Sequence, residues 1–119
     1  MMRLYVAGKM TGLPEFGFPA FREAAARLRL AGHDVVSPHE VPLPCGCSGL
    51  PPQCGADDHA WREFMRADLI ALLQHADGIA VLPGWERSRG ATVEVRLAEA
   101  LEMDVHPLAY WLADAAVPA

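Results

Sequence analysis

The fold of this chain is decided by residues 76–101, which read A-D-G-I-A-V-L-P-G-W-E-R-S-R-G-A-T-V-E-V-R-L-A-E-A-L. Residues 78–82 form an apolar run that is too short for a helix and has a turn-forming dipeptide on each side. This pattern predicts a buried strand. We expect a loop over residues 83–89 and a helix that opens at Gly90. A strand that leads through a loop into a helix is the repeating unit of a parallel α/β sheet.

Glu94 is the first candidate functional residue of that helix. The residues that share its face by the i, i+3, i+4, i+7 spacing are apolar, namely Leu97, Ala98 and Leu101. Open α/β sheets bind their ligands just beyond the carboxyl ends of their strands, where this carboxylate is expected to lie. The alternative is an ordinary acidic residue near a helix start that pairs with Arg89 or Arg96 on a solvated rim.

Ser88 and Gly90 make the start of the same helix a candidate anion site. Free N–H groups at a helix start attract anions, and the spacing Ser88-x-Gly90-x-x-x-Glu94 predicts a phosphate cradle close to the carboxylate. Serine and glycine are also ordinary N-cap residues, so a plain helix cap is the alternative. Arg87, Arg89 and Lys9 are further candidate contacts for an anion.

Length and charge restrict the classes of protein that the chain can belong to. With 119 residues, of which 52% are hydrophobic, it is expected to fold as a single globular domain over residues 1–119. A formal net charge of −5 argues against binding nucleic acid or a membrane surface through a general positive field. No apolar run approaches the roughly 18 residues of a membrane span, and the first residues look like a strand rather than a signal peptide. We therefore expect a cytoplasmic protein.

The rest of the chain alternates between strand and helix patterns. Strands are predicted at 4–7, 33–37 and 104–108, and helices at 19–31, 59–75 and 110–113. The segment between the first strand and the first helix holds three glycines and a proline, so it is expected to be a loop. This order predicts a three-layer α/β fold of flavodoxin-like or Rossmann-like type, with a four- or five-stranded parallel sheet.

Asp68 is the second candidate, because it interrupts the apolar stripe of the second long helix. The stripe of the first long helix is Phe21, Ala24, Ala25, Leu28 and Ala31, and that of the second is Trp61, Met65, Leu69, Leu72, Leu73 and Ala76. A buried carboxylate is costly unless it is paired or used. We favour a functional role for Asp68, and the alternatives are an ion pair with Arg66 or a place at the wet margin of the stripe.

Residues 38–58 form the one irregular region, which holds five prolines and all three cysteines. A stretch of this length inside a compact domain is expected to be functional or locally stapled. Cys45, Cys47, Cys54 and His59 supply four ligands of the kind that zinc prefers, although the C-x-C spacing differs from the usual C-x2-C pairing. The alternative to a structural zinc is a set of reduced loop cysteines, as is common in the cytosol.

Three stretches of the chain carry a resemblance to a known family. They read L-Y-V-A-G-K-M-T-G, R-A-D-L-I-A-L-L-Q-H-A-D-G-I-A-V-L and S-R-G-A-T-V-E. In that order they resemble the first strand and loop, the central helix and strand, and the catalytic loop of the nucleoside 2-deoxyribosyltransferase-like superfamily. The chain looks most like small, often phage- or prophage-encoded members. Among members of assigned activity, it looks most like the 2′-deoxynucleoside 5′-monophosphate N-hydrolases.

The resemblance implies a hydrolase or transferase that cleaves the N-glycosidic bond of a (deoxy)nucleoside 5′-monophosphate and requires no cofactor for the chemistry. It implies that Glu94 is the nucleophile of a glycosyl-enzyme intermediate, that Tyr5 orients this carboxylate, and that Asp68 is the second acid. Ser88 is similar to the phosphate-binding serine, where transferases of unphosphorylated nucleosides carry an aspartate. The other residues assigned to substrate binding are Gly8, Lys9, Met10, Trp85 and Gly90.

Two other functions stay open beside this enzyme. One is a nucleotide-binding protein without turnover, such as a sensor or a sequestering protein, and the other is an interaction module stapled by zinc in the cysteine-rich region. We expect the protein to work as a homo-oligomer of two or more subunits, because a domain this small encloses a nucleotide poorly. Aromatic residues of the kind enriched at interface cores are Trp61, Trp85, Tyr110 and Trp111.

Overall fold

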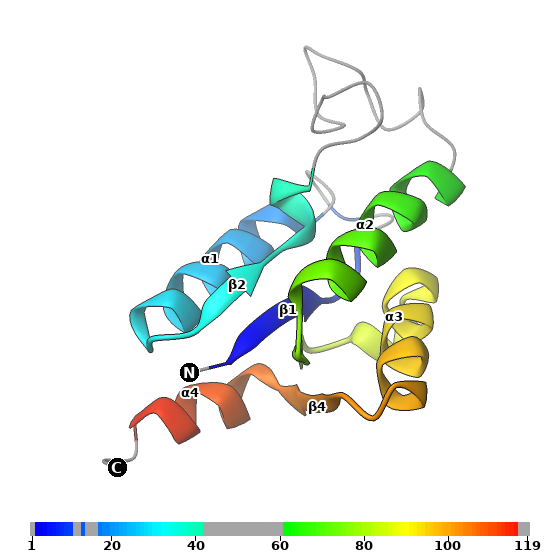
Figure 1. Cartoon of the computed structure of the whole chain (residues 1–119). Helices are drawn as coiled ribbons and strands as arrows, with labels where there is room; N and C mark the ends of the chain where they lie inside the picture. Colours follow the sequence, from blue (N-terminus) through cyan, green and yellow to red (C-terminus); the bar gives the residue numbers. More distant parts are fainter. Residues whose placement is uncertain (1, 11–12, 14–16, 42–60, 117–119) are drawn as a thin grey trace.

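The chain folds around a four-stranded parallel sheet in the order β2-β1-β3-β4, with helices on both faces (Figure 1). The computed structural model describes residues 2–10, 13, 17–41 and 61–116. Its elements are β1 (Arg3–Ala7), α1 (Phe18–Leu30), β2 (Asp34–Val36), the 3-10 turn η2 (Pro38–Glu40), α2 (Trp61–His75), β3 (Gly78–Val81), the 3-10 turn η4 (Trp85–Arg87), α3 (Arg89–Ala100), β4 (Asp104–Pro107) and α4 (Leu108–Ala116). The predicted flavodoxin-like or Rossmann-like fold class is confirmed.

The strand order creates a switch point between β1 and β3. From β1 the chain moves outward to β2, then crosses back to place β3 on the other side of β1. Tyr5 pairs in register with Val36 of β2 and with Ile79 of β3. The segments that follow β1 and β3 therefore diverge at the carboxyl edge of the sheet. This is where open α/β sheets bind their ligands.

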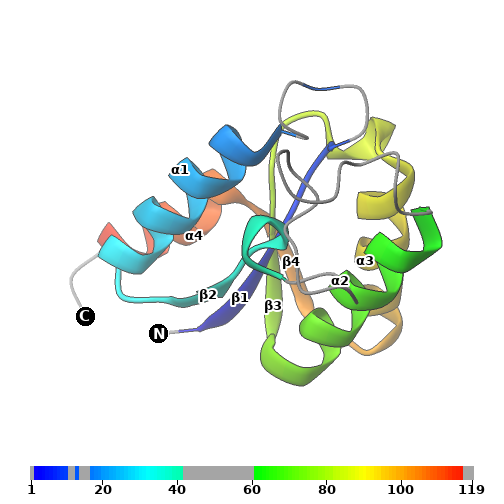
Figure 2. The ribbon, with the colours of Figure 1, turned by 90° about the horizontal axis from the view of Figure 1, so that it is seen from above.

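The strand alternation divides the core into two apolar clusters, one on each face of the sheet. Leu4 and Val6 of β1 pack on the face covered by α1 and α4, whereas Tyr5 and Ala7 pack on the face covered by α2 and α3. Figure 2, seen from above, shows the two helix pairs on opposite sides of the sheet. Side chains at every second position of β1, counted from Tyr5, consequently point into the layer of α2 and α3.

Most predicted elements are confirmed, with small shifts at their ends. Helix α3 begins at Arg89 rather than Gly90, because Ser88 is its N-cap. The predicted loop before it contains one 3-10 turn, η4. The last helix is longer than the single turn predicted, since it begins directly at Leu108 and places Leu112 against the α1/α4 cluster.

Two predicted core residues are wrong, because Leu73 and Leu101 are each 53% exposed. The buried face of α2 is centred on Met65, Asp68 and Leu72, so Leu73 lies one position beyond it. Leu101 is the C-cap of α3 and lies past the last helical turn that faces the sheet. The side chain of Trp61, also assigned to the α2 stripe, lies outside the described residues.

Trp111 packs inside its own chain rather than at an interface. Its side chain is 3% exposed, and its Nε1 donates to the Ile79 carbonyl at 2.9 Å. His33 accepts a bond from the Met2 N–H at Nδ1, so its Nε2 carries the proton and donates to the Trp111 carbonyl at 3.2 Å. Trp111 therefore joins α4 to the sheet, and the expectation that it serves an oligomer contact is wrong.

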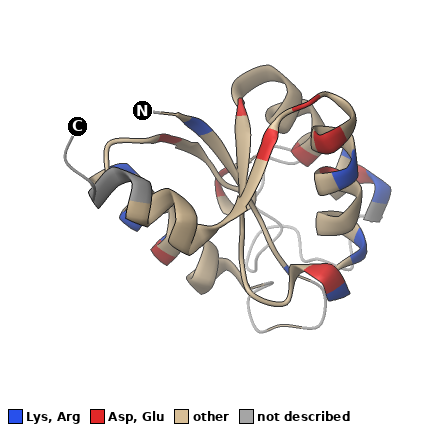
Figure 3. Ribbon diagram, turned by 90° about the horizontal axis from the view of Figure 1, so that it is seen from below, with Lys and Arg blue, Asp and Glu red and all other residues tan. Residues whose placement is uncertain are grey.

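Charged residues of both signs occur on the helices of both layers, as the view from below shows (Figure 3). This agrees with the modest net charge of −5 and with the absence of a general positive field among the described residues. Within the same ranges, none of the helices combines the length and the apolar character that a membrane span requires.

Candidate active site

Tyr5 is the strand residue from which the candidate site is built. It lies at the middle of β1, and its side chain points toward α2 and α3 and is completely buried. A buried tyrosine needs a partner for its hydroxyl. The Tyr5 hydroxyl donates its hydrogen bond to Oε2 of Glu94, 89 residues further along the chain.

Glu94 lies on the inner face of α3, one and a half turns from the helix start. It is 4% exposed, and the residues that share its face are apolar, namely Ala91, Val95 and Ala98. The prediction that this carboxylate points into the core is therefore confirmed. The alternative of a solvated rim pair with Arg89 or Arg96 is wrong, because Glu94 is buried and its hydrogen bond comes from Tyr5.

Asp68 brings a second carboxylate into the same layer from α2. It is 6% exposed, and no group among the described residues donates a hydrogen bond to it. Its charge raises the pKa of both Tyr5 and Glu94. We refer to Tyr5, Asp68 and Glu94 as the buried acid cluster.

Burial makes the acid cluster hold protons more tightly than exposed acids do. It raises the pKa of Asp68 to about 7. Burial, followed by repulsion from Asp68, raises the pKa of Glu94 to about 8, while the Tyr5 hydrogen bond lowers it. For Tyr5, burial first and then the charge of Glu94 raise the pKa well above its ordinary value. The two carboxyl groups consequently keep about one proton between them near neutral pH.

The Tyr5 hydrogen bond favours the charged form of one of the two carboxyl groups. The pKa of Glu94 includes repulsion from a charged Asp68, and this repulsion is absent while Asp68 keeps its proton. Tyr5 then stabilises a charge on Glu94, whereas no described group donates to Asp68. An ionised Glu94 beside a protonated Asp68 would be the arrangement of a nucleophile and a general acid, and the hydrogen bond from Tyr5 favours the ionised form of Glu94.

No basic side chain compensates the acid cluster. All ten lysines and arginines of the chain lie within the described residues, and none of them contributes to the pKa of Tyr5, Asp68 or Glu94. Arg66, considered as a partner for Asp68, is exposed on the outer face of α2. The cluster is thus a pair of buried acids without a cation among the residues that the structure describes.

Ser88 stands at the start of α3 as its N-cap. Its Oγ accepts a hydrogen bond from the Ala91 N–H at 3.1 Å, and its carbonyl accepts one from the Thr92 hydroxyl at 2.7 Å. Ser88 therefore caps the helix, which was the alternative to a phosphate contact. A hydroxyl that accepts one bond still has its own proton to donate, so the cap leaves a donor for an anion.

The other residues predicted to bind substrate lie on both faces of the sheet. Gly8 is buried at the end of β1, where an added Cβ would lie 3.1 Å from the Leu82 side chain, and Lys9 is exposed beside it. Met10 packs against the α1/α4 cluster, on the other face of the sheet from the acid cluster. Trp85 is half-buried against the α2/α3 cluster, and Gly90 lies in the first turn of α3.

The four predicted zinc ligands, Cys45, Cys47, Cys54 and His59, lie outside the described residues. Within the described part of the chain, no group of three or more His, Cys, Asp or Glu side chains is arranged to hold a metal ion. The zinc hypothesis for the cysteine-rich region therefore stays a prediction.

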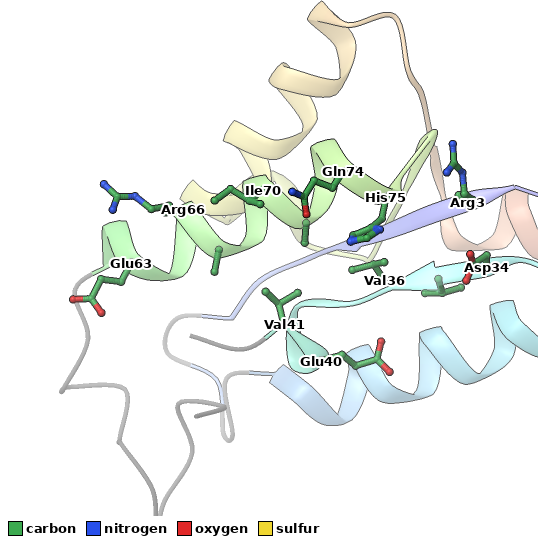
Figure 4. A pocket seen from close by; sticks show the side chains of 13 residues that line it. Arg3, Asp34, Val36, Glu40, Val41, Glu63, Arg66, Ile70, Gln74 and His75 are labelled. Carbon is green, nitrogen blue, oxygen red and sulfur yellow. The ribbon is translucent and has the colours of Figure 1, made fainter. Parts of the chain in front are cut away.

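Two cavities lined by described residues lie apart from the acid cluster. One of about 700 Å³ runs between α2 and the β2–η2 edge, and Figure 4 shows residues that line it from α2, such as Gln74 and His75, and from the neighbouring segment, such as Val36 and Val41. The other, of about 380 Å³, lies at the carboxyl ends of β3 and β4 and includes Trp85. Because neither is lined by Tyr5, Asp68 or Glu94, we base the candidate site on the chemistry of the cluster and not on cavity size.

A polar network at the carboxyl end of β2 was not predicted from the sequence. Ser37 is fully buried, and its Oγ lies 2.7 Å from Nδ1 of His39. Glu40 takes a hydrogen bond from Arg29 at 2.6 Å. The spacing Ser37-x-x-Glu40 matches a capping box and is the signal that could have revealed this turn.

Comparison with known proteins assigns the chain to a family. A family model described as a domain of unknown function, DUF4406, matches residues 2–107, which include all three members of the acid cluster. No curated protein matches the chain.

Proposed function

This chain belongs to the DUF4406 family, and we propose that it cleaves the N-glycosidic bond of a (deoxy)nucleoside 5′-monophosphate with Glu94 as the nucleophile. The observation that carries the proposal is the buried acid cluster, in which the Tyr5 hydroxyl donates to Glu94 beside Asp68. The resemblance to the nucleoside 2-deoxyribosyltransferase-like superfamily, and to its 5′-monophosphate N-hydrolases, supports the same assignment.

The proposed reaction has two displacement steps at the anomeric carbon. Oε2 of Glu94 is held by Tyr5, so Oε1 attacks the carbon while the bond to the base breaks and its electron pair leaves with the base. Asp68 gives its proton to the departing base and becomes a carboxylate. Water then attacks the same carbon, returns a proton to Asp68 and releases Glu94. An acceptor hydroxyl or base in place of water gives transfer instead.

The charge of the acid cluster suits the transition state of this reaction. Glycosidic cleavage passes through a transition state with positive charge on the sugar ring. A buried carboxylate without a protein cation stabilises such a charge strongly, because the surroundings screen it weakly. The absence of lysine and arginine influence on Asp68 and Glu94 therefore supports glycosidic chemistry.

The start of α3 supports a phosphorylated substrate. The Ser88 hydroxyl and the N–H groups of the first helical turn lie at the positive end of the helix, one and a half turns from Glu94. A 5′-phosphate bound there would be separated from the carboxylates by the length of the sugar. Ser88→Asp is then expected to weaken 5′-monophosphates far more than unphosphorylated nucleosides, by like-charge repulsion.

The test is incubation with each common nucleoside 5′-monophosphate, with free base measured by chromatography. Glu94→Gln should abolish base release while the fold is retained, because the amide is nearly isosteric but cannot form the glycosyl ester. Glu99→Gln is the matched control, since Glu99 is exposed on the same helix. Normal turnover by Glu94→Gln would remove Glu94 from the mechanism.

A nucleotide-binding protein without turnover is the second candidate. It is favoured by the burial of both carboxyl groups, which leaves little of either surface open to a substrate. In this case a nucleoside 5′-monophosphate should bind and remain intact on long incubation. Loss of base that depends on Glu94 would exclude it. Metal analysis of the purified protein separately tests the zinc-stapled interaction module.

A further inference from the structure

The smaller cavity, at the carboxyl ends of β3 and β4, has the features of a second binding site. Its volume is about 380 Å³, and it is lined by α1, by the segment that follows β3 and by the beginning of α4. Most of its walls are apolar, and they include Val81, Leu82, Trp85, Pro107, Leu108 and Leu112. Ligand sites in proteins usually have volumes of about 300–1,000 Å³, so this cavity fits a small molecule.

Two side chains of opposite charge, Arg27 and Glu86, lie among these apolar walls. Arg27 belongs to α1 and Glu86 to η4, so the fold brings two distant segments to one cavity. Within the described ranges, neither side chain forms an ion pair or a hydrogen bond, and the two do not pair with each other. A ligand that carries both charges would give each of them a partner, whereas a ligand with one charge would be repelled by one of the two.

The beginning of α4 adds hydrogen-bond donors to the same cavity. Leu108 and Ala109 are the first two residues of this helix, and the first N–H groups of a helix have no partner within it. Pro107 precedes them and has no side-chain oxygen that could cap the helix. The positive end of the helix dipole therefore favours a negative group of the ligand at this wall, in addition to Arg27.

We propose that this cavity binds a free α-amino acid with a large apolar side chain. The carboxylate would pair with Arg27, the ammonium group would pair with Glu86, and the side chain would pack against Leu82 and Leu112. A nucleotide fits less well, because its phosphate adds negative charge beside Glu86. The proposal does not depend on glycosidic chemistry, since no member of the acid cluster lines the cavity.

The experiment titrates phenylalanine into the isotope-labelled full chain at pH 7 and follows the amide and indole signals by NMR. The signals that shift should belong to residues that line the cavity, such as Ala109 and the indole N–H of Trp85. Phenylalanine should bind at least about tenfold tighter than phenylpropionate or phenethylamine, each of which carries one of the two charges. It should also bind at least about tenfold tighter than glycine, which has no apolar side chain.

Substitutions at the two charged residues test their separate roles. Arg27→Gln should remove the advantage of phenylalanine over phenethylamine, and Glu86→Gln its advantage over phenylpropionate. Arg96→Gln and Glu99→Gln are the matched controls, because both positions are exposed on α3 and neither lines the cavity. Ala109→Leu fills the cavity from an exposed position and should abolish binding, and thermal unfolding shows whether each variant keeps its fold.

Three results would overturn the proposal. These are no binding of phenylalanine at millimolar concentration, equal affinity for the three aromatic ligands, or an affinity that is unchanged in both Arg27→Gln and Glu86→Gln. The outcome is separable from that of the proposed function. Base release from a monophosphate is measured without amino acid and depends on Glu94, which does not line this cavity.

Discussion

At the scale of single residues, Asp68 and Glu94 place buried carboxyl groups at positions where apolar side chains would serve the fold better. Both lie on helix faces whose other members pack against the sheet, and neither has a basic partner among the described residues. An apolar residue at either position would bury the same volume without a desolvation cost. Such local conflicts with the core pattern are expected at functional sites.

The raised pKa values predict that stability falls as the pH rises. Because burial raises the pKa of Asp68 to about 7 and that of Glu94 to about 8, their contribution is complete below about pH 4 and is lost as the pH rises through 7 to 8. We expect urea unfolding to give a free energy several kcal/mol lower at pH 9 than at pH 5, at about 1.4 kcal/mol per pKa unit.

Glu94→Gln tests the assignment of this slope. The variant cannot ionise at this position, so it should lose clearly less stability between pH 5 and pH 9 and be more stable than the parent at pH 9. Glu99→Gln, at an exposed position, should follow the parent. Parallel pH curves for the parent and Glu94→Gln would contradict the buried titration.

At the scale of elements, α3 is closed at both ends by local hydrogen bonds. Ser88 caps its start, and a Schellman motif closes its end, with the Met103 N–H bound to the Ala98 carbonyl at 2.9 Å and the Glu102 N–H bound to the Glu99 carbonyl at 3.0 Å. Glu102 adopts a left-handed conformation with φ of 60° to form this motif. Glycine would adopt it without steric cost.

Glu102→Gly is therefore expected to stabilise the protein. Release of the left-handed strain should raise the free energy of unfolding by about 0.5–1 kcal/mol. Glu99→Gly, three residues earlier and inside the helix, is the control and should lower it by about 1 kcal/mol. Chemical denaturation at pH 7 measures both. A loss of stability in Glu102→Gly would show that the Glu102 side chain makes a contribution larger than the strain.

The outer edge of β2 is protected by a side chain from α1. Arg29 donates from Nη2 to the Val35 carbonyl at 2.9 Å, and Glu40 holds the same guanidinium group at 2.6 Å. Val35 is the middle residue of an edge strand, so its carbonyl would otherwise be open to pairing with another chain. Arg29 thus blocks the edge rather than simply adding a surface ion pair.

Arg29→Ala is expected to increase aggregation with little loss of stability. The exposed ion pair with Glu40 contributes at most about 1 kcal/mol, whereas the freed edge can pair between molecules. Light scattering during slow heating should show an earlier rise in Arg29→Ala than in Arg27→Ala, which removes the same charge two residues away. Equal curves for the two variants would mean that the edge is protected by other means.

At the scale of the whole molecule, homo-oligomer formation stays a proposal. Fewer of the aromatic residues predicted for the contact are available for it than the sequence suggested. Trp111 is part of the core, so truncation before Tyr110 would damage the fold rather than an interface. Tyr110 is 48% exposed and stacks on His106 at 3.8 Å, and α2 leaves Ile70 and Leu73 about half exposed. Tyr110, Ile70 and Leu73 are therefore the candidates for a contact between subunits.

Sedimentation velocity at micromolar concentration tests this proposal. We expect a species at least twice the 12.9 kDa monomer mass, because a second subunit would enclose the proposed nucleotide site, which one small domain would leave open. Leu73→Ser and Tyr110→Ser should shift the equilibrium toward the monomer if their surfaces form the contact. A single 12.9 kDa species across the whole concentration range would reject assembly.

The sequence by itself determined the fold class and the inward direction of both carboxylates. Short apolar runs and helical spacing are local properties, so they identified the strands and helices and placed Asp68 and Glu94 on buried helix faces. The ends of helices were predicted less accurately, as α4 and the start of α3 show. Caps and tertiary packing decide where a helix begins and ends.

Only the tertiary structure decided which groups meet. The contact of Tyr5 with Glu94, which the residue pattern did not predict and the family resemblance implied, joins residues 89 positions apart. It depends on β1 lying beside β3 and on α3 covering the same face. The same sheet order places Met10 on the opposite face and Trp111 in the core. That no lysine or arginine of the described residues acts on the acid cluster is likewise a property of the assembled layers, because local spacing carries no information about neighbours from distant segments.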